Sequence, residues 1–181
     1  MPGWSSLLAF VVAAGTPALV ILFYLEGLVI GKVLQPPVLF VGFVAAIDPS
    51  ILRLTVLAVL CLVAATLGQW TLYRGFDEDA EELIGIRRTV PYLDSVPERV
   101  RERVGETRLD TMEAYLDRHG VGTILVANSL PGVRGVPSIV AGTGGYPVRR
   151  FIAASTVGNA VYFALLSGAA LGIGALARVF V

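Results

Sequence analysis

Five polar residues lie within otherwise apolar segments of this chain: Glu26, Lys32, Asp48, Asn128 and Arg134. A polar or charged group in apolar surroundings loses its hydration, which is unfavourable unless the protein supplies a partner. In a segment that lies inside a membrane, an ionisable residue indicates a functional site. These five positions are therefore the candidates for binding or proton transfer.

Arg134 is the most informative of them, because it lies at a break in an apolar segment. Residues 130–137 read Leu-Pro-Gly-Val-Arg-Gly-Val-Pro, and prolines and glycines in such a run predict that one helix ends and another begins. An arginine stays charged at physiological pH and can bind a phosphate through two parallel hydrogen bonds. We therefore expect Arg134, Asn128 and the chain at Gly132 and Gly135 to bind an anionic substrate.

Glu26 is the first candidate for proton or ion coupling, because a carboxyl group in an apolar setting can take up and release a proton. The alternative is a structural ion pair between Glu26 and Arg134. The two interpretations are compatible, since a phosphate can displace the carboxylate. Asp48 is the second candidate for coupling, and its alternative is an ordinary N-cap of a helix that begins near Ile51.

The composition indicates a membrane protein. Of the 181 residues, 55% are hydrophobic and 15% are charged, whereas soluble domains carry about 25% charged residues. A formal net charge of zero gives no overall positive field for nucleic acid. The single cysteine, Cys61, excludes an intramolecular disulfide. With the single histidine, His119, it leaves too few ligands for a typical zinc site. We expect no metal, no cofactor and no catalytic residue.

Long uncharged runs predict three transmembrane spans, each long enough to cross a hydrocarbon core of about 30 Å. They lie at residues 5–25, 51–73 and 151–178. A polar insert at residues 75–119 holds 12 of the 14 acidic residues but only seven arginines, so its net charge is −5. Acidic residues at the start and arginines at the end predict helices at residues 77–88 and 97–118 of this insert.

The two remaining apolar segments are interrupted by proline. Residues 26–47 contain Pro36 and Pro37, and residues 120–147 contain the break at 130–137. A broken helix in lipid must be covered by protein or water, so each segment is predicted to form a re-entrant helical hairpin. Each half of the chain is then a hairpin followed by a span, and the hairpins enter from opposite faces of the membrane. Such an inverted repeat is typical of many secondary transporters.

The predicted fold is thus all-α: a single membrane domain over residues 1–181 with transmembrane helices, two opposed re-entrant hairpins and a helical insert. Cytoplasmic loops of membrane proteins are rich in lysine and arginine. One face carries Arg74, the arginines of the insert, Arg149 and Arg150, and the other carries Lys32, Arg53 and Arg178. We therefore expect a multi-pass protein of the cell membrane with residues 75–119 in the cytoplasm.

Several short stretches resemble the DedA family, also called the SNARE-associated Golgi or VTT-domain family. The family pattern is approximately FxxxG…RFxPGxR…AG…F…G(N), and residues 115–120, 130–135 and 158–159 are similar to it. Upstream, Glu26, Pro36 and Pro37 look like the acidic, proline-containing first hairpin of the family. The resemblance covers residues 20–165.

The resemblance implies an integral membrane protein that translocates lipid. In prokaryotic relatives this is the recycling of polyprenyl phosphates, in eukaryotic ones the scrambling of phospholipids, and dependence on the proton-motive force has been proposed for some members. The family's essential acid of hairpin one corresponds to Glu26, and the second arginine of RFxPGxR corresponds to Arg134. Two positions depart from the pattern: Asn128 replaces the first arginine, and no second acid follows Pro36 and Pro37.

We therefore expect a transporter or flippase, not an enzyme, that moves an anionic lipid such as a polyprenyl phosphate, with proton or ion coupling left open. Membrane lipids are the expected partners, nucleic acid is not, and homo-oligomerisation stays open. The alternatives are a phospholipid scramblase, a membrane scaffold and an enzyme that acts on lipid phosphates. If Asn128 faces the binding cavity, Asn128→Arg should tighten anion binding about fivefold.

The predicted topology is testable by labelling. Cysteines introduced at Asp79 and Arg149 should react with an impermeant thiol reagent from the same side of the membrane. The reason is that a re-entrant hairpin over residues 120–147 returns the chain to the face from which it came. Labelling from opposite sides would show that this segment crosses completely, and the inverted repeat would then be wrong.

Overall fold

A computed structural model of the protein describes residues 14–28, 35–77 and 106–180, and within these residues the regular structure is helical, without strands. The all-α prediction is confirmed for this part of the chain. In chain order, the helices are α2 (Thr16–Gly27), α3 (Pro36–Ile47), α4 (Ile51–Phe76), α6 (Glu106–His119), α7 (Val121–Ser129), α8 (Val136–Thr143) and α9 (Val148–Phe180). Lys32, the start of the span predicted at 5–25 and the helix predicted at 77–88 lie outside the described residues.

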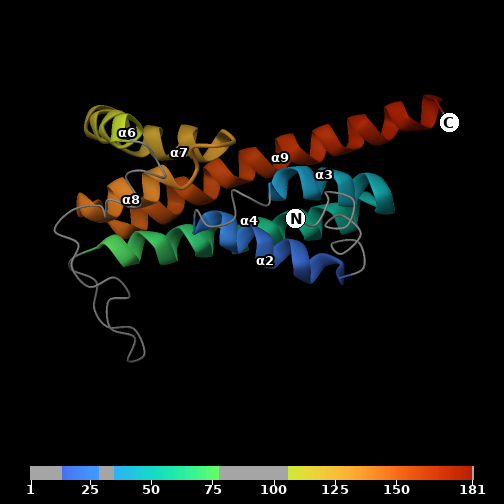
Figure 1. Cartoon of the computed structure of the whole chain (residues 1–181), viewed down its shortest axis with the longest axis horizontal. Coiled ribbons are helices and arrows are strands. Elements are labelled where there is room, and N and C mark those ends of the chain that lie inside the picture. Colours follow the sequence, from blue (N-terminus) through green and yellow to red (C-terminus); the bar gives the residue numbers. More distant parts are fainter. Residues whose placement is uncertain (1–13, 29–34, 78–105, 181) are drawn as a thin grey trace.

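Among the described helices, α4 and α9 are long and apolar enough to cross a membrane. With 26 and 33 residues, they extend about 39 and 50 Å at 1.5 Å per residue, and a hydrocarbon core is about 30 Å thick. They confirm long helices at the spans predicted for residues 51–73 and 151–178 and continue a few residues beyond them. Figure 1 shows α9 along most of the length of the molecule, with its C-terminal part continuing past α3.

The four short helices of the apolar segments have 8 to 12 residues each. Between α7 and α8 the helix is interrupted around Pro131 and Gly132, as the sequence predicts, and Gly132 has φ +91°, a conformation that glycine adopts readily. Pro36 and Pro37 begin α3, where the missing N–H of proline breaks no helical hydrogen bond. The boundary predicted between the span at residues 5–25 and the hairpin at residues 26–47 falls inside a helix, because Glu26 lies in the last turn of α2.

The N-cap interpretation of Asp48 is wrong. Asp48 is the C-cap of α3, with φ +46° and its backbone N–H donated to the Val44 carbonyl, and Ser50 is the N-cap of α4. An N-cap residue typically has an extended backbone, whereas the left-handed backbone of Asp48 is a conformation that commonly ends a helix. Asp48 itself is exposed at the end of α3.

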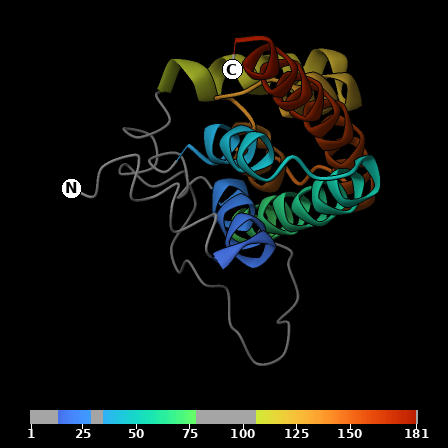
Figure 2. The same ribbon diagram turned by 90° about the vertical axis from the view of Figure 1, so that its right-hand side faces the viewer.

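The helices pair in a pattern that is the same for both halves of the chain. The long helices α4 and α9 pack against each other; α2 packs along α4 and α3 against α9, while α7 packs along α9 and α8 against α4. Exchanging α2, α3 and α4 for α7, α8 and α9 therefore leaves the pairing unchanged. Helix α6, the described part of the helix predicted at residues 97–118, packs on α7 and α8 (Figures 1 and 2).

Two apolar cores form at opposite ends of the α4–α9 pair. The first core lies around α2 and α3 and includes Phe23, Phe40 and Phe163, whose rings meet edge to face. The second lies around α6, α7 and α8 and includes Tyr73 stacked on Phe151. Because α4 and α9 contribute to both cores in opposite chain order, they run antiparallel. A group of buried polar side chains lies between the two cores.

Three glycines allow close approach at two of these contacts, between α2 and α4 and between α4 and α8. A Cβ atom on Gly68 of α4 would overlap the backbone carbonyl of Tyr24 in α2, and one on Gly27 would lie 2.5 Å from the carbonyl oxygen of Ala65. Likewise, a Cβ on Gly142 would lie 2.6 Å from the Tyr73 carbonyl oxygen. Small residues let transmembrane helices approach closely, and here they bring α2 and α8 onto α4.

Gly68→Ala should therefore destabilise the protein, because its methyl group has no space between α2 and α4. We expect the free energy of unfolding to fall by about 1–3 kcal/mol, a typical cost of overpacking, measured as a lower Tm of the purified protein in detergent. Gly168→Ala is the matched control, since a Cβ at Gly168 in α9 meets no atom within 4 Å. An equal Tm for both variants would contradict this account of the α2–α4 contact.

Candidate functional site

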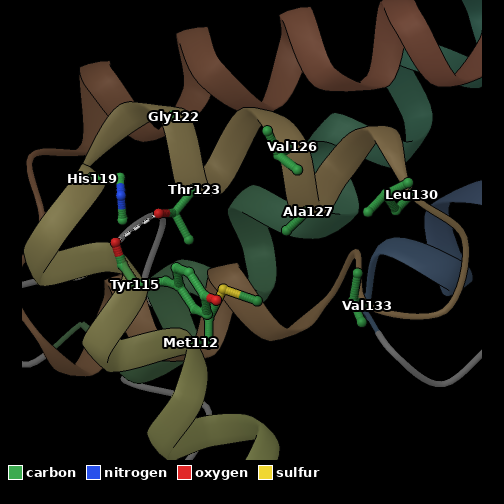
Figure 3. A pocket seen from close by; sticks show the side chains of 9 residues that line it. All are labelled: Met112, Tyr115, His119, Gly122, Thr123, Val126, Ala127, Leu130 and Val133. Carbon is green, nitrogen blue, oxygen red and sulfur yellow. Dashed lines mark hydrogen bonds between the residues drawn. The ribbon is translucent and has the colours of Figure 1, made fainter.

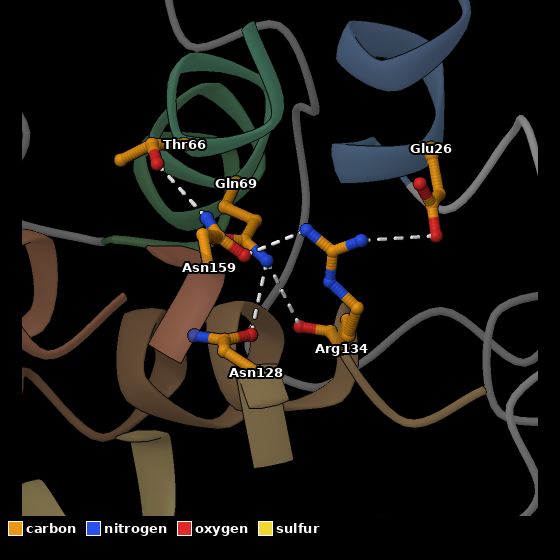
Figure 4. Close-up of polar contacts among 6 residues, drawn as sticks. All are labelled: Glu26, Thr66, Gln69, Asn128, Arg134 and Asn159. Carbon is orange, nitrogen blue, oxygen red and sulfur yellow. Dashed lines mark hydrogen bonds and ion pairs between the residues drawn. The ribbon is translucent and has the colours of Figure 1, made fainter. Parts of the chain in front are cut away.

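The buried polar group is centred on the guanidinium of Arg134, which the break between α7 and α8 places between the two apolar cores. Arg134 is 5% exposed. Its Nη1 lies 3.2 Å from Oε1 of Glu26, and its Nη2 donates to Oδ1 of Asn159 at 2.6 Å (Figure 4). The guanidinium carbon lies 3.8 Å from the ring centre of Tyr162, within the range of a cation–π interaction. The positive charge thus has compensating groups on three sides.

The ion pair between Glu26 and Arg134 joins the two halves of the chain. Glu26 belongs to α2, and its side chain is 12% exposed. The close approach of α2 to α4 at Gly27 brings this helix end toward the break that carries Arg134. The structure confirms the ion pair proposed from the sequence. Removing one partner of a buried pair leaves an uncompensated charge, which typically costs about 3–5 kcal/mol.

A network of side-chain amides lies beside the arginine and connects α4, α7 and α9. Gln69 donates to Oδ1 of Asn128 at 2.9 Å and weakly to the Arg134 carbonyl at 3.4 Å. Asn159 donates to Oε1 of Gln69 at 3.0 Å and to the Thr66 hydroxyl at 2.9 Å. Gln69, Asn128 and Asn159 are all fully buried. We refer to Glu26, Thr66, Gln69, Asn128, Arg134, Ser155 and Asn159 as the polar layer.

Asn128 takes part in this layer through neutral hydrogen bonds only. Besides accepting from Gln69, it donates to the Ser155 hydroxyl at 3.0 Å, so both ends of its amide are engaged. A Cβ atom added to Gly158 of α9 would lie 2.8 Å from the Cβ of Asn128, so the two helices are in close contact here. Asn128 therefore lies against packed helices, and it is connected to Arg134 through Gln69 and Asn159 rather than directly.

The structure brings some of the predicted site residues together and separates others. Glu26, Asn128 and Arg134 meet in the polar layer. Gly135 is buried next to Arg134 at the start of α8, whereas Gly132 is exposed at the turn. Asp48 is exposed at the end of α3, unlike the buried members of the layer.

Sequence reasoning missed Gln69, Asn159 and Tyr162 as members of the site. A signal for the amides was present, because Gln69 and Asn159 are polar residues within uncharged apolar runs, the same criterion that identified Asn128. The role of Tyr162 had no such signal, since a tyrosine in a membrane helix is commonplace at interfaces. Only the packing of α9 against the break shows that its ring covers Arg134.

The chemistry that this arrangement supports is the binding and release of an anion. Nε of Arg134 and the hydroxyl group of Ser138 are buried, and neither has a hydrogen-bond partner among the described residues. A phosphate can use both Nε and a terminal nitrogen of an arginine, replacing the carboxylate. Among the residues described, no group of three or more His, Cys, Asp or Glu side chains could hold a metal ion.

Comparisons with known proteins identify the family. The VTT domain family matches residues 1–170 of the chain. This match includes both halves of the helix pattern and every residue of the polar layer. No curated protein and no solved structure matches the chain.

The environment of Asn128 decides the expected outcome for Asn128→Arg. The substitution should lower the free energy of unfolding by about 3–5 kcal/mol, because it places a second cation in a layer that contains no free carboxylate for it. Asn128→Ala is the control, since it removes the two hydrogen bonds without adding charge and should be less destabilising. Both are read from Tm, together with an isotherm for a lipid phosphate. Tighter binding with an unchanged Tm would show that Asn128 faces a cavity instead.

Proposed function

The chain belongs to the VTT-domain or DedA family, a family of membrane proteins linked to transport or flipping, and on this premise we propose that it moves an anionic lipid across the membrane. The substrate class that fits best is a polyprenyl phosphate, with its phosphate on Arg134 and its chain in the bilayer. The family match and the apolar helices α4 and α9 already indicate a membrane protein. The proposal adds the lipid that is moved, the direction of its movement and the coupling to protons or another ion.

The observation that carries this proposal is the buried guanidinium of Arg134. Arg134 is permanently charged and only 5% exposed within an apolar helix bundle. Burying such a charge is costly, so its presence indicates a functional site. Its fork of donors suits phosphate better than the point charge of lysine does. One terminal nitrogen contacts Glu26, and Nε is buried without a hydrogen-bond partner within residues 14–28, 35–77 and 106–180. Arg134 can therefore donate hydrogen bonds to a phosphate once the Glu26 carboxylate is displaced, without a large rearrangement of the helices.

We further propose that α2–α3 and α7–α8 are two opposed re-entrant hairpins of an inverted repeat. The helix pairing supports this, because it is unchanged when the halves are exchanged. The lengths also support it: helices of 8 to 12 residues extend about 12–18 Å, roughly half a hydrocarbon core. The polar layer lies where the two hairpins meet. By the arginine distribution, the side that carries α6 is cytoplasmic, in the cell membrane.

The proposed cycle uses the exchange of partners on Arg134. A lipid phosphate displaces the Glu26 carboxylate, and Glu26 can then take up a proton, so that the layer never holds two unpaired charges. After the hairpins rock against each other, the phosphate leaves to the other leaflet, and Glu26 releases its proton there and pairs again with Arg134. This exchange gives a place for proton coupling without a catalytic group. Because Asp48 is exposed at the end of α3, we assign it no step in this cycle.

A translocation assay in proteoliposomes tests the proposal. Fluorescent analogues of a short-chain polyprenyl phosphate and of phosphatidylglycerol are compared, with and without a pH gradient. Arg134→Ala should abolish translocation, and Arg134→Lys should retain roughly a tenth of the rate, because lysine keeps the charge but loses the planar fork. The double variant Glu26→Gln with Arg134→Gln leaves no unpaired charge and controls for folding through its Tm.

The outcomes separate the alternatives. Full activity of Arg134→Lys would indicate that Arg134 only balances the charge of Glu26. Equal movement of both lipids without dependence on Arg134 would favour a phospholipid scramblase. Release of inorganic phosphate would favour an enzyme. A scaffold would be favoured if neither lipid were translocated and if binding of a protein partner depended on the insert at residues 75–119 alone.

A further inference from the structure

A pocket lies beside the segment of α7 that leads to the break carrying Arg134. It has a volume of about 530 Å³ and opens between α6 and α7. It is lined by Met112, Tyr115, His119, Gly122, Thr123, Val126, Ala127, Leu130 and Val133 (Figure 3). A volume of this size is within the range of small-molecule sites, about 300–1,000 Å³.

The pocket is a groove that follows the axis of α7. Its lining residues on α7 recur every three or four positions from Gly122 to Ala127 and continue to Leu130, and those on α6 recur in the same way from Met112 to His119. Residues at this spacing share one face of a helix. Because α7 has nine residues, the groove extends about 13 Å, close to half of a hydrocarbon core of about 30 Å.

The walls of the groove are suited to a hydrocarbon chain. Its lining residues in the described part of the chain include no carboxylate, lysine or arginine. The Thr123 hydroxyl donates to the Tyr115 carbonyl at 2.7 Å, so this polar group is already engaged. A peptide in the groove would need partners for its backbone N–H and C=O groups, and these walls offer few. The two polar rings of the lining, those of Tyr115 and His119, lie at one end, with their ring centres 5.8 Å apart.

The groove and the site proposed for the head group are formed by neighbouring residues of the same segment. Leu130 and Val133 form its inner end, and Val133 directly precedes Arg134 in the chain. In α7, Ala127 lines the groove while the next residue, Asn128, belongs to the polar layer. One short helix and one break therefore separate an apolar site from a charged one.

We infer that this groove binds one hydrocarbon chain of a membrane lipid. The head group lies at the His119 end, and the chain end lies against Leu130 and Val133. The inference rests on the proposed lipid transport, for which the groove would hold a lipid of the adjacent leaflet before its phosphate reaches Arg134. Because the groove contacts only the hydrocarbon chain of the lipid, it accepts lipids with different head groups. Arg134 then selects the lipids with an anionic head group.

Gly122 allows a sharp test, because a Cβ at this position meets no atom within 4 Å. Gly122→Phe should fill the groove without a clash. Gly168→Phe is the matched control: the same ring is added at a glycine of α9 that is equally open and does not line the groove. Val126→Trp is a second blocking variant, since Val126 lines the groove and is 55% exposed.

The probe is a phosphatidylglycerol with a photoreactive diazirine at the end of one acyl chain, reconstituted with the full-length protein in vesicles. After irradiation, mass spectrometry locates the adducts. We expect them to concentrate on residues 126–133 of the unmodified protein and to decrease at least about fivefold in Gly122→Phe and Val126→Trp. In Gly168→Phe they should be unchanged, and all variants should keep the Tm of the parent.

Adducts spread evenly over the exposed residues of α9, or equal adducts at 126–133 in Gly122→Phe and Gly168→Phe, would overturn the inference. Arg134→Gln distinguishes this failure from failure of the proposed function. Blocked labelling in Gly122→Phe without any Arg134-dependent translocation would keep the groove and refute the transporter. Arg134-dependent translocation with unblocked labelling would keep the transporter and refute the groove.

Discussion

The structure depends on the burial of one guanidinium group in an apolar helix bundle. Arg134 remains charged at physiological pH, so the fold must bring compensating groups to it. A carboxylate comes from α2, an amide oxygen from Asn159 and an aromatic face from Tyr162. These groups belong to both halves of the chain, and only the packing of α2, α4 and α9 brings them together. The glycine contacts between α2 and α4 serve this same requirement.

The buried charge of the polar layer is balanced by one pair, Glu26 and Arg134. The chain lacks the first arginine of the motif, replaced by Asn128, and it lacks a second acid after Pro36 and Pro37. One cation and one anion are thus absent, and Glu26 and Arg134 remain as a balanced pair. The neutral amide of Asn128 can then complete the network with Gln69 without an unpaired buried charge, which would be strongly unfavourable.

The segment from α7 to α8 presents two different chemistries because of the helical period. Asn128 faces the polar layer, whereas Val126 and Leu130 line the apolar groove. The break that follows allows Arg134 to leave the axis of α7 and enter the layer. In the proposed transport, this one segment would contact the chain of a lipid first and its phosphate afterwards. Selectivity for chain and for head group can therefore be altered by separate residues.

Local patterns along the chain predict the all-α class, the long helices at 51–73 and 151–178, the break around Pro131 and Gly132, and the candidates Glu26 and Arg134. These features follow from local hydropathy, from proline and glycine, and from the rule that a charge in an apolar segment needs a partner. Tertiary structure alone decided which partner each polar group has: the bonds of Arg134 to Glu26 and Asn159 join residues 108 and 25 positions apart. It also decided that Asp48 ends α3 and that Asn128 faces packed helices. The physical reason is that apolarity and chain-breaking residues act over a few neighbouring positions, whereas a buried hydrogen bond depends on how distant helices approach one another.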